Sequence, residues 1–127
     1  MKIFSWEKDG GEKSTVHGLY IIEIKSLFSI VLLRFSNGSR EAYHSHAFNC
    51  FSWILSGKLK EHHKDGKENW LIPSWKPFCT YRDTYHKVIS YDNTWALTFR
   101  GPWKDNWKEY LEDEDRERTL THGRIEI

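Results

Sequence analysis

The chain consists of short apolar runs rich in β-branched and aromatic residues, and turn-forming residues interrupt each run. Runs of about four to eight such residues are typical of strands, whereas a helix needs a longer segment with a helical period. Seven Trp, seven Phe and six Tyr support strands, because aromatic side chains pack well on a pleated surface. The pattern predicts an all-β fold with strands over residues 19–24, 27–35, 41–46, 50–55, 58–63, 69–71, 78–82, 86–90 and 95–100.

Turn residues separate these expected strands. Residues 36–39 and 64–67 combine glycine with Asn or Asp, which tolerate a positive φ, and Ser56-Gly57 allows a tight reversal. Most neighbouring strands are therefore expected to pair as hairpins in an antiparallel meander or barrel. Because proline cannot donate to a central ladder, the segment from Pro73 to Pro77 is expected to cross the barrel rim.

A length of 127 residues is close to that of one domain, so a single domain is expected. In this interpretation residues 1–18 form an N-terminal arm and residues 104–127 form a charged C-terminal segment. Residues 112–118 are all charged, a pattern typical of a solvated face or loop.

Charge and cysteine content exclude several classes of protein. The formal net charge is +1 and both signs are interleaved, so no nucleic-acid polymer is expected as a partner. Cys50 and Cys79 are too few for a disulfide scaffold and lack zinc-site spacing, which indicates a reducing compartment. Because no apolar segment approaches the roughly 20 residues that span a bilayer, we expect a cytoplasmic protein, in the host cytoplasm if viral.

Two histidines provide the first candidate site. His44 and His46 are two residues apart, and in a strand this spacing directs both imidazoles to the same face. Neutral imidazole nitrogens are suitable ligands for a divalent transition metal such as Fe, Mn, Ni or Zn. The alternative is a pair of solvent-facing histidines on an edge strand, which the spacing alone does not exclude.

The surrounding sequence supports the metal interpretation. After His44 and His46 comes an apolar strand that ends at Gly57, and a third histidine, His86, belongs to a later strand. This order resembles the two-part signature of the cupin superfamily. The resemblance implies a cupin-type antiparallel β-barrel, or double-stranded jelly roll, in which His44, His46 and His86 hold a metal. The chain departs from the signature at Cys50, where cupins usually have an acidic ligand.

A narrower resemblance, over roughly residues 19–125, is to uncharacterised small cupins common in bacteriophage genomes. It is based on His44-Ser45-His46-Ala47-Phe48-Asn49, Ser52-Trp53-Ile54-Leu55-Ser56-Gly57, His86-Lys87-Val88, Phe99-Arg100-Gly101-Pro102 and Leu120-Thr121-His122-Gly123-Arg124. It implies no settled activity.

Glu61 is the candidate replacement for the missing acidic ligand. In an alternating strand Leu59 and Glu61 share one face, opposite Lys60, so Glu61 faces the interior if Leu59 does. The alternative is a surface carboxylate paired with a lysine.

Four further residues are candidates for contact with a bound molecule. The guanidinium groups of Arg82 and Arg100 can bind a carboxylate or phosphate with two hydrogen bonds each. Trp53 can stack on a ring, and Asn49 lies three residues after His46. The alternative places the arginines on the surface and the tryptophan in the core.

Three functions remain open from sequence. The first is a mononuclear-metal enzyme acting on a small anionic molecule. The second is a phage-type binding protein that sequesters a nucleotide-derived immune signal without turnover, an inference from analogy with the phage cupins. The third is a structural module whose histidines fill the barrel. The resemblance to cupins also implies a homodimer, in which the N-terminal strands or the Trp-rich tail cover the exposed edge.

Overall fold

The computed structural model describes residues 1–9, 14–36, 43–111 and 114–127. These residues form strands and no α-helix, so they contain no apolar helix long enough to cross a bilayer. The strands are β1 (Lys2–Lys8), β2 (Val16–Ile24), β3 (Phe28–Phe35), β4 (Cys50–Ser56), β5 (Leu59–His63), β6 (Glu68–Leu71), β7 (Phe78–Thr80), β8 (His86–Ser90), β9 (Thr94–Arg100), β10 (Asn106–Leu111), β11 (Arg116–Thr121) and β12 (Ile125–Glu126).

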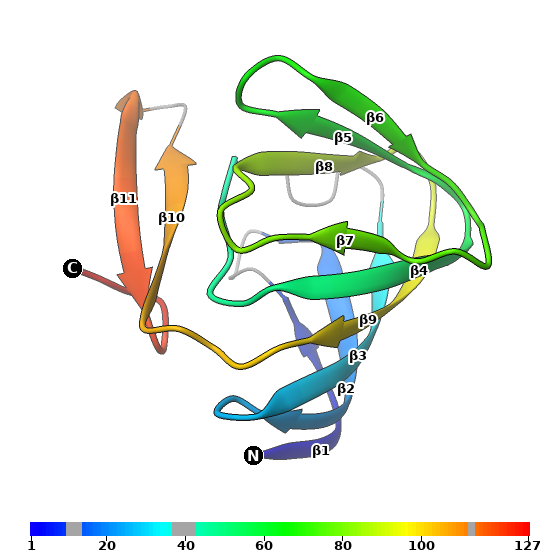
Figure 1. Cartoon of the computed structure of the whole chain (residues 1–127), viewed down its shortest axis with the longest axis horizontal. Coiled ribbons are helices and arrows are strands. Elements are labelled where there is room, and N and C mark those ends of the chain that lie inside the picture. The colour runs from blue at the N-terminus through cyan, green and yellow to red at the C-terminus, as the bar shows by residue number, and fades with distance from the viewer. Residues whose placement is uncertain (10–13, 37–42, 112–113) are drawn as a thin grey trace.

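The strands form three antiparallel sheets. The largest has the order β1-β2-β3-β9-β4-β7, and a second sheet has the order β6-β5-β8. Figure 1 shows the second sheet lying opposite the curved larger sheet, with the β10–β11 hairpin to one side of both. A third sheet joins β10, β11 and β12. This arrangement confirms the all-β, antiparallel fold class expected from the sequence.

Two apolar clusters stabilise the sheets. Ile54 and Ala96 of the larger sheet pack against Leu59 and Val88 of the smaller one, which holds the two sheets face to face. Val16, Tyr20, Val31 and Leu33 form a second cluster between β2 and β3. Burial alternates strictly along β8 and β9, as expected for strands with one face turned inward.

The expected strands agree closely with the observed ones, apart from residues 41–46. Every other expected strand is present, with ends shifted by at most three residues. Residues 41 and 42 lie outside the described residues, and 43–46 form an extended segment with isolated bridges at His44. The 36–39 turn also lies mostly outside the described residues.

The two terminal segments contain more regular structure than the sequence indicated. Residues 1–18 include β1, which pairs along its length with β2, and are thus part of the sheet. Residues 104–127 include β10, β11 and β12, in which Trp107 and Leu120 are buried among charged neighbours. The charged composition indicated a solvated segment. The sequence does not show that several of these charges neutralise one another in ion pairs, which allows the strands to form.

The strand order also differs from a simple meander of hairpins. β9 lies between β3 and β4, and β8 pairs with β5. The segment from Pro73 to Pro77 connects β6 to β7 and so passes from one sheet to the other, as expected.

Gly57 makes the turn between β4 and β5 possible. Its φ is +82°, and an added Cβ would lie 2.5 Å from Thr94 Oγ1 and 2.6 Å from the Asn93 carbonyl oxygen. Gly66, in the β5–β6 turn, also has a positive φ of +98°, but an added Cβ would meet nothing within 4 Å. A side chain at Gly57 would meet both an unfavourable φ and a steric clash, whereas a side chain at Gly66 would meet only the unfavourable φ.

We predict that Gly57→Ala destabilises the protein by about 2 kcal/mol or more, because it combines unfavourable φ with a clash. Gly66→Ala should cost only about 1 kcal/mol, from φ alone. Urea denaturation of both variants tests the difference. Equal losses would contradict the role of the close approach to Thr94.

Candidate metal centre and cavity

His44, His46 and His86 form a cluster of imidazoles. One ring nitrogen of each lies within 4.8 Å of the other two, and the ring centroids are 4.8 to 5.1 Å apart. A shared ion with metal–nitrogen bonds of about 2.1 Å requires nitrogens roughly 3 to 3.5 Å apart, so the imidazoles would have to approach one another on binding an ion. The three residues predicted as metal ligands therefore converge, and their donor set fits a divalent transition metal, whose identity three imidazoles do not determine.

Backbone hydrogen bonds hold two of these histidines together. The His44 amide donates to the His86 carbonyl at 2.8 Å, and the His86 amide donates to the His44 carbonyl at 3.0 Å. On the other side of the segment, the Ser45 amide donates to the Lys108 carbonyl of β10. The segment carrying His44 and His46 is therefore fixed between β8 and β10 despite forming no long ladder.

Glu61 contacts His86 directly. Its Oε2 accepts a hydrogen bond from His86 Nδ1 at 2.6 Å, and its Oε1 lies 3.0 Å from His63 Nε2 and 3.3 Å from Asn69 Nδ2. Glu61 is buried with Leu59, so the prediction that both face inward is confirmed. The structure places its carboxylate behind His86, outside the cluster of three imidazoles, where both oxygens are already engaged.

The ionised state of Glu61 determines which nitrogen of His86 is available. Burial disfavours the charged carboxylate, but hydrogen bonding and attraction to His86, with help from Asn69 and His63, lower the pKa of Glu61 to about 2. A carboxylate can only accept, so His86 Nδ1 carries the proton and Nε2 keeps its lone pair for a metal. Carboxylates commonly orient metal-binding histidines in this way.

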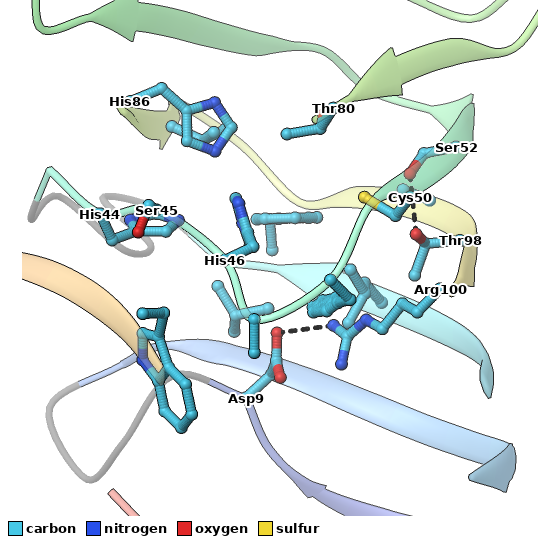
Figure 2. A pocket seen from close by; sticks show the side chains of 18 of the residues that line it. Asp9, His44, Ser45, His46, Cys50, Ser52, Thr80, His86, Thr98 and Arg100 are labelled. Carbon is cyan, nitrogen blue, oxygen red and sulfur yellow. Dashed lines mark hydrogen bonds and ion pairs between the residues drawn. The ribbon is translucent and has the colours of Figure 1, made fainter. Parts of the chain in front are cut away.

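A cavity of about 540 Å³ extends from the histidines into the interior. Figure 2 shows the three imidazoles on one side of it and Arg100 on the other. Between them, Cys50, Ser52, Thr80 and Thr98 line the wall, and Ser52 donates to Thr98 at 2.8 Å. Burial raises the pKa of the Cys50 thiol, which favours its protonated form.

Arg100 is a fully buried cation in this cavity. Its guanidinium donates to Asp9 Oδ2 at 3.0 Å, and Tyr20 donates its hydroxyl proton to Asp9 Oδ1 at 2.8 Å. Burial, together with the negative charge of Asp9, raises the pKa of Tyr20, so its hydroxyl remains a donor. Arg100 was predicted to contact a ligand, with a surface position as the alternative; the structure places it in the cavity lining, where it also supports the fold through this ion pair.

The charges lining the cavity are unequal in number. Lys8, Lys25, Arg100 and Arg124 contribute cations, whereas Glu7 and Asp9 contribute carboxylates. With neutral histidines the described lining is thus positive before any metal is added. This balance favours an anionic occupant.

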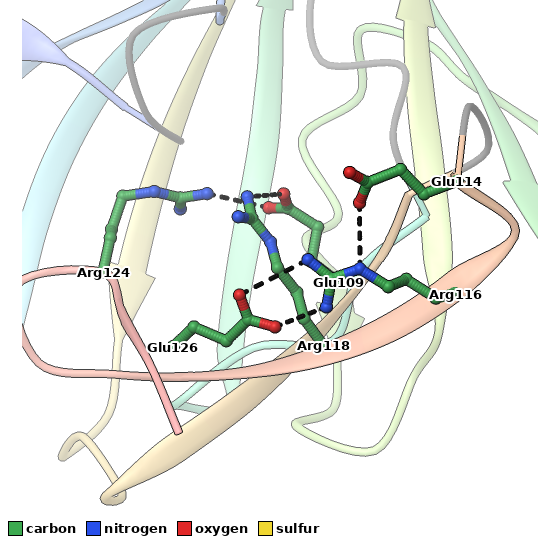
Figure 3. A network of polar contacts seen from close by, with 6 residues as sticks. All are labelled: Glu109, Glu114, Arg116, Arg118, Arg124 and Glu126. Atoms are coloured by element: carbon green, nitrogen blue, oxygen red, sulfur yellow. Dashed lines mark hydrogen bonds and ion pairs between the residues drawn. The ribbon is translucent and has the colours of Figure 1, made fainter.

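The C-terminal strands form one wall of the same cavity. Trp107 of β10 packs with Ala47 and Leu120, and Trp103 and Arg124 also line the space. Buried Glu109 accepts hydrogen bonds from Arg118 at 2.6 Å and Arg124 at 2.8 Å (Figure 3). This network holds the C-terminal turn with Arg124 against the cavity.

The other residues predicted to contact a ligand lie outside this lining. Trp53 alternates with buried Ser52 and Ile54, so it faces away and donates its indole proton to the Trp75 carbonyl. Asn49 is exposed, and its Oδ1 accepts from the Arg82 amide at 2.6 Å. Arg82 lines a separate space of about 280 Å³ that shares His46 with the main cavity. Their roles in ligand binding remain predictions.

Sequence reasoning missed several lining residues. Tyr20 could have been found from the alternation of Val16, Gly18 and Tyr20, which are all buried. Asp9 could not, because its importance depends on contact with Arg100, 91 residues away. The site also includes Trp107, which lay within the segment expected to be a charged tail.

We predict that the double variant His44→Ala, His46→Ala loses stoichiometric binding of Zn²⁺ or Mn²⁺ in calorimetric titrations. Glu61→Gln should weaken binding by about 10- to 100-fold, because it removes the negative charge that orients His86. His62→Ala and Glu68→Gln are matched controls, since His62 Nδ1 pairs with Glu68 at 3.1 Å away from the cluster. Unchanged binding by the double variant would refute this centre.

Stability of the metal-free protein should depend on the charge of Glu61. Its folded pKa of about 2 lies below its ordinary value of 4.5, so the ionised form stabilises the fold above pH 4.5. That contribution should disappear as pH falls from 4.5 toward 2. Chemical denaturation of Glu61→Gln should show a smaller decrease in the free energy of unfolding over this pH range. The same decrease as in the unaltered protein would contradict the assignment.

No protein-family model and no curated protein matches this chain. Solved structures with the same fold include a sugar phosphate isomerase of the cupin superfamily from Silicibacter pomeroyi, at 14% identity and a TM-score of 0.67. That alignment covers 98% of this chain and 89% of the other.

Two further structures support the same assignment. The polyketide cyclase RemF from Streptomyces resistomycificus is 13% identical with a TM-score of 0.73, covering 88% of this chain and 83% of that one. An RmlC-like cupin from Shewanella frigidimarina is 16% identical with a TM-score of 0.61, covering 78% and 84%. The narrower resemblance to bacteriophage cupins stays a prediction. The chain therefore has the cupin fold, as the order of its histidines and glycine implied.

Proposed function

We propose that this protein is a metal-dependent enzyme acting on a small anionic molecule that carries hydroxyl groups. The observation that supports this most is the shared cavity, which joins three convergent imidazoles to a buried guanidinium. A bound divalent ion would polarise a carbonyl or hydroxyl oxygen of such a molecule.

The two ends of the cavity are close enough for one metabolite to contact both. The Phe48 ring lies 5.5 Å from the His46 ring and 4.7 Å from the Arg100 guanidinium carbon. The centre of the His46 ring and the Arg100 guanidinium carbon are therefore no more than about 10 Å apart. A cavity of about 540 Å³ is within the usual range for small-molecule sites.

The wall between the ends suits a hydroxylated ligand. Ser52, Thr80 and Thr98 can donate to or accept from hydroxyl groups, and the protonated Cys50 thiol adds a weak donor. Arg100 would bind a terminal carboxylate or phosphate, while Trp103 and Trp107 exclude water at the side of the C-terminal strands. A sugar phosphate, the substrate type named for the Silicibacter pomeroyi protein, combines these features.

The ion pair with Asp9 limits how strongly Arg100 attracts an anion. Asp9 neutralises part of the charge of Arg100. A guanidinium has five N–H donors, however, and only one of those of Arg100 donates to Asp9, at 3.0 Å. The remaining donors and the surplus of lining cations support anion binding. Tyr20 positions Asp9 and needs no role in catalysis.

The test uses metal-loaded protein and a panel of sugar phosphates and sugar acids, followed by NMR to detect binding and product. Arg100→Gln should raise the Kd or KM by about 10- to 100-fold, because charge-assisted hydrogen bonds to an anion are lost. Its melting temperature should fall, since Asp9 loses its buried partner. Lys67→Gln is the charge-matched control, because Lys67 lies in the exposed β5–β6 turn.

The variant lacking His44 and His46 distinguishes the functions. It should bind an anion but form no product. If this variant binds the anion as tightly as the unaltered protein does, and both proteins leave the anion chemically intact, then the protein sequesters its ligand and is not an enzyme. If neither protein binds any member of the panel, the anionic-ligand proposal fails.

A further inference from the structure

The outer face of the three-stranded sheet carries a regular row of basic residues. Along β5 the buried residues Leu59 and Glu61 face inward, so alternate residues face outward. The outward residues of β5 and its two flanking positions are Lys58, Lys60, His62 and Lys64. Because residues two apart on a strand are separated by about 6.8 Å, this row extends over about 20 Å.

Each lysine of this row contacts an aromatic ring. The ammonium groups of Lys58 and Lys60 lie 4.8 and 4.6 Å from the centre of the Trp70 ring on β6. At the other end of the row, the ammonium group of Lys64 lies 4.2 Å from the centre of the Tyr110 ring on β10. Positive charge and flat rings therefore alternate along the same face.

This surface extends across the neighbouring strands. Tyr43 lies between β8 and β10: the Tyr110 amide donates to its carbonyl at 2.8 Å, and the Lys87 ammonium group is 4.7 Å from the centre of its ring. Tyr91 follows β8, with its ring centre 6.1 Å from that of Trp70, and the two side chains remain 59% and 47% exposed. We define the lysine–aromatic band as Lys58, Lys60, Lys64, Lys87, Tyr43, Trp70, Tyr91 and Tyr110.

The lysine–aromatic band has an excess of positive charge. Glu68 lies beside it, 3.5 Å from the Lys60 ammonium group and 3.1 Å from His62 Nδ1. Lys58 and Lys64 form no ion pair with a carboxylate of the described residues. The net charge of +1 does not predict this excess, because acidic residues of other segments offset it. A local excess of lysines favours a polyanionic partner.

From the spacing, the charge and the exposed rings we infer that the lysine–aromatic band binds single-stranded nucleic acid, either DNA or RNA. Ammonium groups bind phosphates as point charges, and every base has a flat face that can stack on an exposed aromatic ring. A duplex keeps its bases stacked inside the helix, so it would offer the band only phosphates. The inference goes beyond the proposed function and does not depend on it, since the histidine cluster lies on the opposite face of β8.

Fluorescence anisotropy of the full chain with labelled oligo-dT and oligo-rU of about 12 nucleotides tests the inference. If the four lysines contact phosphates, a plot of log Kd against log salt concentration should have a slope of about 2.8. The double variant Lys58→Gln, Lys64→Gln should bind more weakly and show about half that slope, because two of the four phosphate contacts are lost.

Stacking is tested at Trp70. Trp70→Ala should raise the Kd about 5-fold or more, whereas Trp70→Phe should restore most of the affinity because it keeps a flat ring. Trp75→Ala and Lys76→Gln are matched controls: these residues form a similar pair, 5.5 Å apart, in the segment beside Trp53 of the larger sheet. Circular dichroism checks that each variant is folded.

Binding of either single strand, with losses confined to the variants of the lysine–aromatic band, would support the inference. Absence of binding by the unaltered protein at low salt would overturn it. Equal affinity for an abasic strand or for heparin would also overturn it, because the surface would then accept any polyanion. The same holds if a dT·dA duplex binds more tightly than oligo-dT, or if the control variants lose as much affinity as the band variants.

Discussion

The mutual backbone hydrogen bonds between His44 and His86 are the interaction on which the site depends. They join an irregular segment to β8, and β8 in turn pairs with β5, which carries Glu61. Two candidate ligands and the carboxylate that orients one of them are therefore fixed by main-chain geometry.

The polar residues on the inner face of β9 determine what its outer face carries. A strand exposes alternate residues to opposite faces, so placing Thr98 and Arg100 in the cavity commits Leu97 and Phe99 to the outside. A polar interior is needed for a ligand that carries hydroxyl groups and charge. Leu97 and Phe99 consequently lie on the outer face of the sheet, apart from the apolar clusters that pack inside it.

Local patterns predicted the strands and the histidine cluster well. The His-x-His spacing and the Leu59–Glu61 alternation depend on the two-residue period of a strand, which sequence shows directly. The resemblance to cupins supplied His86, since no local pattern relates a histidine to a pair about 40 residues earlier. Trp53, predicted to stack on a ligand, instead lies outside the cavity lining, because its neighbours Ser52 and Ile54 face inward.

What the sequence could not predict depends on contacts between distant segments. β9 lies between β3 and β4, a pairing that hairpin rules do not produce. The C-terminal strands looked solvated because Glu109, Arg118 and Arg124 are all charged, and only their mutual neutralisation permits burial.

The buried Arg100 shows how the termini complete the site. Its countercharge, Asp9, follows β1, while Arg100 ends β9, and Trp107 and Arg124 belong to the C-terminal segment. A fully buried guanidinium is strongly disfavoured without such a partner, so Arg100 can occupy the cavity only when the N-terminal strand is in place. Removing residues 1–9 would therefore leave an unpaired cation in the same cavity as the three histidines. The segments that the sequence indicated as an N-terminal arm and a charged tail are therefore parts of the cavity wall.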